Sequence, residues 1–241
     1  MTYGKYFKKG QKIFLKRIFT DQDQRALDTV TAYTVRSYPT QLDVTLPYGS
    51  DAADSYPFEP DMRFEIMTDH KGMGLRLMAK FAGKISRQDI RLVFEGNLEF
   101  ISQRIYPRVD VNAWLGLKRS RSDLAAMRKL CLEHLQKIKS GVSAAELTHF
   151  KKYPINLAAG GLRLPLDPPV EPAELVLVYL SIGDKQGIVC TLAEVVWVGS
   201  EGPDGRVPAG LRFLNILEKD QSRIDAVVKN LRDLLNLSNA E

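Results

Sequence analysis

The stretch that decides the fold reads Tyr153-Pro154-Ile155-Asn156-Leu157-Ala158-Ala159-Gly160-Gly161-Leu162-Arg163-Leu164. Leu162-Arg163-Leu164 alternates apolar and polar residues, as a half-buried strand does. The two glycines before it suit a turn with positive φ, and they let a ligand approach the backbone closely. Asn156 can present both a donor and an acceptor to such a ligand. The pattern predicts a turn at the rim of a β-barrel, and the alternative interpretation is an ordinary hairpin turn.

Similar alternation predicts further strands on both sides of this stretch. In the first hundred residues it occurs at Leu42–Leu46, Phe64–Ile66, Leu75–Leu77 and Leu92–Phe100. Turn signals at Tyr48-Gly49-Ser50, Lys71-Gly72 and Ala82-Gly83 separate these runs. Several short strands without a long helix predict a small antiparallel barrel. Later strands are expected at Leu175–Leu180, Ile188–Val198 and Gly210–Phe213.

Helices are predicted in the middle and at the end of the chain. Ser122 suits the N-cap of the first helix and Gly141 its C-cap. The helical spacing places His134 on the polar side of this helix. The apolar stripe between the caps consists of Leu124, Met127, Cys131, Leu135 and Ile138. A short helix is expected from Ser143 to about Phe150, and an amphipathic helix from about Asp220 to Leu235.

The composition indicates a folded chain of two domains. Its 241 residues are 44% hydrophobic and 26% charged, which is enough to bury a core and argues against disorder. No apolar run approaches the roughly 20 residues that a membrane span needs. The segment Met1–Gly10 lacks the apolar core of a signal peptide. Two cysteines, Cys131 and Cys190, are too few and too far apart in sequence for a disulfide framework, so a cytoplasmic protein is expected.

Enzyme signatures are missing from the sequence. The three histidines, His70, His134 and His149, show no metal-ligand spacing. The chain has no HExxH, GxSxG or P-loop sequence and no Gly-rich dinucleotide turn after a strand. We therefore expect a binding protein rather than an enzyme, without a metal or a cofactor.

Positive charge is concentrated in the middle of the chain. Residues 103–165 carry 12 Lys and Arg against 4 Asp and Glu, a net charge of +8. The excess begins with the segment Gln103–Val111, in which Pro107 favours an extended backbone at Tyr106. In an extended chain Arg104 and Arg108 point to one side, about 13 Å apart. Two guanidiniums so placed can fork onto phosphate oxygens or stack on a purine. The alternative is two ordinary surface arginines.

Taken together, the two segments resemble the PilZ domain, the bacterial receptor for cyclic di-GMP. The RxxxR of Arg104 and Arg108 is followed by Asn156-x-Ala158-x-x-Gly161, which is similar to the family's [DN]xSxxG. The segments around Lys9–Ile13 and Gln41–Pro47 resemble the small barrel that precedes PilZ in flagellar-brake-type (PilZN-like) proteins. The resemblance implies a mainly β protein with accessory helices, built from an N-terminal split barrel and a six-stranded PilZ barrel. The implied domains are 1–102 and 103–241, with a helical insertion around 122–150 and a C-terminal helix.

The resemblance also implies a ligand site for cyclic di-GMP. Arg104 and Arg108 would hold the phosphates and stack on guanine, Asn156 would bind a guanine edge, and Gly161 would keep the turn open. The full implied set is Arg104, Arg108, Asn156, Ala158, Gly160 and Gly161. Ala158 stands where the family has serine, which removes a hydroxyl contact worth on the order of 1 kcal/mol, or roughly fivefold in affinity. Asn156 follows Arg108 by 48 positions, a longer interval than in the family, because of the inserted helix.

The leading functional hypothesis is a cyclic di-GMP receptor. A ligand that touches both Arg104 and Asn156 would fix the angle between the domains and so control a partner at the flagellar motor or an exopolysaccharide system. One alternative is a degenerate PilZ module that binds protein and no nucleotide. Another is a barrel that binds nucleic acid through its basic residues, although no aromatic residues are interleaved with them. Those basic residues are Lys118, Arg119, Arg121, Lys151 and Lys152.

Overall fold

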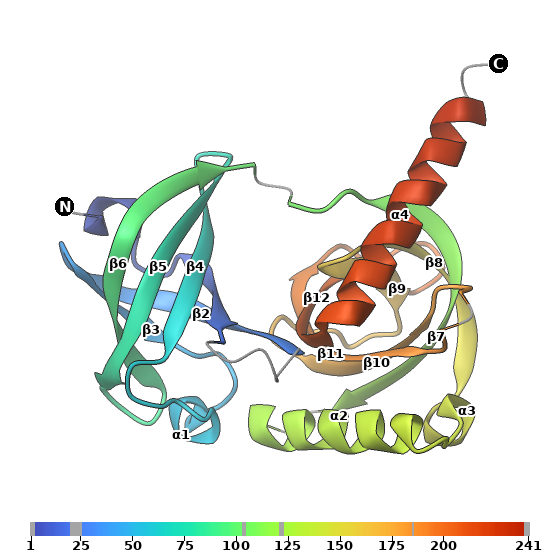
Figure 1. The fold of residues 1–241 in the computed structure, drawn as a ribbon, viewed down its shortest axis with the longest axis horizontal. Coiled ribbons are helices and arrows are strands. Elements are labelled where there is room, and N and C mark those ends of the chain that lie inside the picture. The colour runs from blue at the N-terminus through green and yellow to red at the C-terminus, as the bar shows by residue number, and fades with distance from the viewer. Residues whose placement is uncertain (1–2, 20–25, 103–104, 121–122, 185, 239–241) are drawn as a thin grey trace. The chain divides into compact units, whose positions relative to one another are not determined.

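The computed structural model describes residues 3–19, 26–102, 105–120, 123–184 and 186–238 (Figure 1). The chain divides into two compact units. The first unit is Met1–Ile105 with Asp123–Ala125, and the second is Tyr106–Ser122 with Ala126–Glu241. Both units are mainly β, as the sequence predicts. In the part of the chain described, no helix has the length and apolar character to cross a membrane.

Six described strands of the first unit close into an antiparallel barrel. They follow one another around it in the order β1-β2-β3-β6-β5-β4, and β4 pairs again with β1. The alternating runs of the sequence supply the apolar residues that this barrel buries, such as Leu42, Phe64 and Leu92. The strands are β1 (Lys12–Ile18), β2 (Ala26–Ser37), β3 (Gln41–Thr45), β4 (Arg63–His70), β5 (Met73–Lys84) and β6 (Asp89–Ile101).

One predicted turn of this unit is wrong. Ala82-Gly83 lies inside β5, where the pairing with β6 shifts between Phe81 and Gly83. A bulge of this kind accepts a glycine and bends the strand without ending it. Lys71-Gly72 does form the predicted turn, between β4 and β5. The unit also contains the short helices η1 (Gly4–Tyr6) and α1 (Ala52–Ser55).

Six described strands of the second unit close into another antiparallel barrel, which confirms the six-stranded barrel implied by the resemblance. Their order is β7-β8-β9-β12-β11-β10, and β10 pairs again with β7. The strands are β7 (Val109–Ser120), β8 (Phe150–Ala158), β9 (Gly161–Leu166), β10 (Leu175–Ser181), β11 (Val189–Val198) and β12 (Val207–Leu217).

The predicted middle helix is α2 (Leu124–Lys139). Its stripe is buried as expected: Leu124, Met127 and Cys131 are all almost fully inaccessible. Gly141 ends the helix with φ +95°, and its N–H donates to the carbonyl of Ile138 at 3.1 Å. The predicted N-cap, Ser122, lies outside the described residues.

The position expected for His134 is wrong. The sequence placed it on the polar side of α2, but it is buried, and its Nδ1 forms a hydrogen bond with the hydroxyl of Tyr179 on β10. Burial lowers the pKa of His134 below its usual value, because the charged imidazolium loses water. Cys131, one turn earlier, lies beside Cys190 on β11, and both are buried free thiols; the neighbouring Cys131 thiol and burial raise the pKa of Cys190. The helix therefore packs on the outer side of β10 and β11, which are buried on both faces along Leu175–Leu180 and Val189–Val195.

The remaining helices differ in length from the prediction. The helix α3 (Ala144–Leu147) starts at a capping box of Ser143 and Glu146, and β8 already begins at Phe150. The C-terminal helix α4 (Glu218–Ser238) contacts β7, β8 and β12, and its later part extends beyond the barrel (Figure 1).

An arginine of α4 fixes the start of this helix to the barrel. The Arg223 guanidinium donates to both Asp184 oxygens, at 2.9 and 2.6 Å, and to Asp220 Oδ1 at 2.7 Å. These hydrogen bonds hold the pKa of Asp184 below its usual range. Because α4 begins beside the turn between β8 and β9, this clamp also positions one wall of the site described next.

Candidate functional site

A row of polar side chains crosses the outside of the second barrel. Asp110 on β7 lies directly opposite Asn156 on β8, which in turn lies opposite Arg163 on β9. Asn156 Nδ2 donates to Asp110 Oδ1 at 2.9 Å. This hydrogen bond orients the amide and leaves its carbonyl oxygen as an acceptor. Asp110 and Arg163 are exposed and Asn156 is half-buried, so the row faces solvent.

The same row continues across two more strands. Arg163 lies opposite Gly210 on β12, and Gly210 lies opposite Trp197 on β11. Trp197 is 48% exposed, and a Cβ added at Gly210 would lie 3.6 Å from the Trp197 Cβ. Because Gly210 has no side chain, the Trp197 side chain lies against its backbone, with Cε3 3.7 Å from the position of a Cβ, and no side chain stands between the guanidinium and the indole. Both of these groups can stack on a planar ligand.

Arg163 and Trp197 are candidate ligand contacts that the sequence reasoning missed. In the sequence pattern Arg163 is only the polar residue of an alternating strand, although it comes two residues after Gly161 and so shares its side of β9. Trp197 falls within the strand expected at Ile188–Val198, and nothing in that pattern marks it as a ligand contact. It is 34 positions from Arg163, and only the pairing of β9, β12 and β11 brings the two onto one row.

The turn between β8 and β9 forms one end of this site. Ala158 lies opposite Gly161, with Ala159 and Gly160 between them. A Cβ added at Gly161 would lie 2.1 Å from the Leu211 carbonyl oxygen, closer than real Cβ atoms come to any neighbour. Gly161 therefore lets β9 pair closely with β12. The Gly160 carbonyl accepts a hydrogen bond from the Phe213 N–H at 3.1 Å, which also holds the turn against β12.

Ala158 shares the side of β8 that carries Asn156, because residues two apart on a strand point the same way. Despite this outward position, only 7% of Ala158 is exposed. A hydroxyl at this position would consequently need a partner of its own, either from the protein or from a ligand. The Ala158 methyl group supplies no such contact.

Tyr106 of the RxxxR segment lies on this turn. Its ring would be 3.2 Å from a Cβ added at Gly160. Its hydroxyl donates to Gln221 Oε1 on α4 at 3.1 Å, and Gln221 Nε2 donates to the Ala159 carbonyl at 3.1 Å. The segment before β7, the turn and α4 are thus tied together through one tyrosine and one glutamine.

Arg108 adjoins the turn by its place in the sheet. It precedes Val109, whose partner on β8 is Leu157, so the next position along that strand is Ala158. Arg108 is exposed, and its guanidinium has no hydrogen bond or ion pair with any described residue. The Arg163 guanidinium likewise has none. Two uncompensated cations near a half-buried amide make this edge of the barrel attractive to an anion.

Most of the predicted site residues lie close together. Asn156, Ala158, Gly160 and Gly161 belong to one hairpin, and Arg108 lies beside it. Arg104 lies outside the described residues. In the described part of the chain, His, Cys, Asp and Glu side chains nowhere gather in the groups of three that a metal site requires.

A protein-family model matches the part of the chain that contains this hairpin. The PilZ domain model matches residues 137–230, which include the hairpin and follow Arg108. No curated protein matches the chain in sequence.

Several solved structures also match most of the chain. The Bacillus subtilis inhibitor of motility MotI/DgrA is 15% identical, with a TM-score of 0.38, covering 95% of this chain and 99% of that one. Escherichia coli YcgR in complex with c-di-GMP is 14% identical, with a TM-score of 0.38 and coverage of 95% and 87%. The K. pneumonia MrkH–c-di-GMP complex is 11% identical, with a TM-score of 0.36 and coverage of 96% and 90%. The family match is to the sequence itself and covers β8 to β12, so residues 137–230 of this chain are similar to the PilZ domain.

Proposed function

We propose that this protein binds cyclic di-GMP on the β8–β9 edge of its second barrel and acts as a receptor for it. The observation that carries the proposal is the pair of uncompensated guanidiniums, Arg108 and Arg163, on either side of the Asn156 amide. The ligand has two phosphodiester anions, which suit forked guanidinium donors. Phosphate binding is also the role that the PilZ resemblance implies for Arg108.

The polar row also suits the guanine base. The Watson–Crick edge of guanine presents N1–H and N2–H donors. The free carbonyl oxygen of Asn156 and the Asp110 carboxylate are acceptors on neighbouring strands. We infer that these two residues select a purine with donors on this edge, and that Trp197 and Arg163 offer surfaces on which a base can stack.

The proposed role is binding and regulation in the cytoplasm, and the proposal includes no reaction. Domains 1–102 and 103–241 would be coupled through the junction that carries Arg104 and Arg108. Ligand held by these arginines and by the hairpin would restrict the orientation of the domains and alter how a protein partner is engaged. That partner would belong to the flagellar motor or to exopolysaccharide machinery. Small-angle scattering with and without cyclic di-GMP tests the coupling, which requires that the two curves differ at saturation.

Calorimetric titration with cyclic di-GMP tests the binding itself. Arg108→Ala removes a charge-assisted contact worth about 2 kcal/mol, so the affinity should fall about thirtyfold. Arg232→Ala is the matched control, because Arg232 is an exposed arginine of α4 that forms no ion pair or hydrogen bond with another described residue. Equal affinities for the two variants would refute the assignment of Arg108.

A nucleotide-free interaction module is the second candidate, and Ala158 favours it because the family's hydroxyl is absent there. The absence of any heat with the wild-type protein at high micromolar ligand would establish this alternative. Retention of unrelated oligonucleotides in a salt-dependent manner would instead indicate the nucleic-acid-binding barrel.

A further inference from the structure

Four side chains of the first unit form one continuous surface at an end of its barrel, which we name the Tyr6 face. His70 lies opposite Met73 across the β4–β5 turn, and Phe100 on β6 lies opposite Leu75. Since Met73 precedes Leu75 by two residues, His70, Met73 and Phe100 all point to one side of the sheet. Tyr6 of η1 lies against two of them, with its ring centroid 5.7 Å from that of His70 and 6.0 Å from that of Phe100.

The Tyr6 face is apolar and open to solvent. Met73 is 49% exposed and Phe100 is 51% exposed, although both lie on the side of the sheet that elsewhere faces the core. The barrel interior ends at Leu75, which is buried, and these two side chains extend past it. Exposed large apolar side chains that adjoin one another indicate a surface that is covered in some complex.

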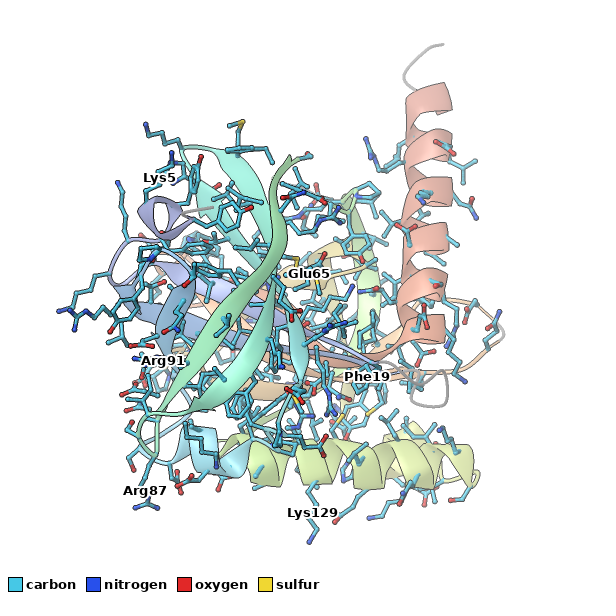
Figure 2. All side chains as sticks on the ribbon, turned by 60° about the vertical axis from the view of Figure 1, so that its left-hand side comes forward. Lys5, Phe19, Glu65, Arg87, Arg91 and Lys129 are labelled. Carbon is cyan, nitrogen blue, oxygen red and sulfur yellow. The ribbon has the colours of Figure 1, made fainter. Side chains whose placement is uncertain are left out.

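Four lysines lie on the segments that carry or adjoin this apolar surface. The Lys5 ammonium lies 5.2 Å from the centre of the Tyr6 ring, and Figure 2 shows Lys5 projecting away from the strands. Lys71 occupies the β4–β5 turn, and Lys8 and Lys9 occupy the loop after η1. None of these four ammonium groups forms an ion pair or hydrogen bond with a described residue.

The lysine loop is held beside the apolar side chains. Gln11 Nε2 donates to Thr68 Oγ1 at 3.0 Å and to the Asp69 carbonyl at 2.9 Å, which ties the loop to β4. Asp69 is the acidic side chain beside the turn, and its Oδ1 accepts from the Gly72 N–H at 3.3 Å. One carboxylate against four lysines leaves this end of the unit clearly positive.

We propose that the Tyr6 face docks on the surface of an anionic lipid bilayer. Met73 and Phe100 would enter the boundary between headgroups and acyl chains, Tyr6 would lie at headgroup level, and the lysines would contact lipid phosphates. A nucleic acid fits less well, because the Tyr6 ring is turned edge to face against His70 and Phe100, at 77° and 81°. Rings packed in this way do not offer the open faces on which bases stack. The inference is independent of cyclic di-GMP.

Co-sedimentation of the full chain with vesicles tests this proposal. Binding is expected to vesicles of phosphatidylglycerol and phosphatidylcholine, and much less to phosphatidylcholine alone. Each lysine near an anionic surface contributes about fivefold to the partition coefficient, so Lys8→Gln with Lys9→Gln should lower it about 25-fold. Lys8→Arg with Lys9→Arg keeps the charge and should retain binding. Met73→Ser with Phe100→Ser should also weaken binding, because it removes the inserted apolar area.

The control double variant is Lys129→Gln with Lys139→Gln, two exposed lysines of α2 (Lys129 is labelled in Figure 2). It changes the net charge by the same amount and should bind vesicles like the wild type. Equal losses in the control and in the Lys8/Lys9 variant would overturn the proposal, and so would equal binding to neutral vesicles. Failure to bind vesicles, together with capture of a DNA duplex that depends on Lys8 and Lys9, would assign the surface to nucleic acid instead.

Discussion

Alanine substitutions at the two adjacent glycines of the β8–β9 turn are expected to behave very differently. At Gly161 the new Cβ would lie 2.1 Å from the Leu211 carbonyl oxygen and 3.1 Å from the Arg212 Cα. Both atoms belong to the backbone of β12, so they can move only if the β9–β12 pairing opens locally. The native φ of +156° adds a conformational penalty, since side-chain-bearing residues rarely adopt it.

The expected cost of Gly161→Ala follows from these contacts. Weakening the rungs Leu211↔Leu162 and Arg212↔Gly161 costs about 1 kcal/mol for each backbone hydrogen bond lost. The backbone conformation adds about 1 kcal/mol. Two lost bonds and this penalty together lower the free energy of unfolding by about 3 kcal/mol, equivalent to roughly 6–12 °C in Tm.

Gly160→Ala is the matched comparison. Its Cβ would meet only the Tyr106 ring, at 3.2 and 3.4 Å, and a side chain can shift by the few tenths of an ångström required. The unfolding free energy should therefore stay within about 1 kcal/mol of the wild-type value. Thermal unfolding followed by circular dichroism measures both variants. A Gly161→Ala protein that melts with the wild-type Tm would refute the assigned role of this glycine in strand pairing.

Three further predictions concern the second unit. Ala158→Ser restores the hydroxyl of the family pattern and should raise the affinity for cyclic di-GMP roughly fivefold, measured by calorimetry; an unchanged affinity would mean that the ligand does not reach this position. Because burial holds the pKa of His134 below its usual 6.5, the unfolded state takes up the proton more readily. The stability that His134 contributes is therefore present above pH 6.5 and lost as the pH falls below 6.5. In His134→Gln, the free energy of unfolding in urea should depend less on pH below 6.5 than in the wild type. Arg223→Ala removes the guanidinium 2.7 Å from the buried Asp220 carboxylate and should lower the free energy of unfolding by about 3 kcal/mol. A denaturation midpoint near the wild-type value would show that Asp220 is not buried in solution.

Much of the fold could be predicted because its signals are local. Alternation of apolar residues marked strands such as β3 and β9, and the helical stripe with Gly141 marked α2 and its end. Both patterns depend on spacings of a few residues, and burial of a single face is enough to produce them. The PilZ resemblance, which depends on short segments of the same kind, is confirmed over residues 137–230.

The errors arose where a longer-range contact overrode a local signal. Ala82-Gly83 has the composition of a turn, but pairing with β6 continues through it as a bulge. His134 is polar and lies beside an apolar stripe, but Tyr179 supplies a partner that makes its burial tolerable. Neither the pairing of β5 with β6 nor the position of Tyr179 can be inferred from residues near the error.

Some residues of the candidate site could likewise be predicted from local sequence, and others depend on contacts between distant strands. By itself, the sequence determined that Asn156 and the Gly160-Gly161 turn belong to one hairpin, because they are neighbours in the chain and share one strand pattern. Only the tertiary structure decided that Arg163, Gly210 and Trp197 continue the row from Asn156, and that Gly161 is required by the backbone of β12. The physical reason is that the barrel closes by hydrogen bonds between strands distant in sequence. Their register sets which side chains become neighbours, and a shift of one residue would turn each of them to the other face.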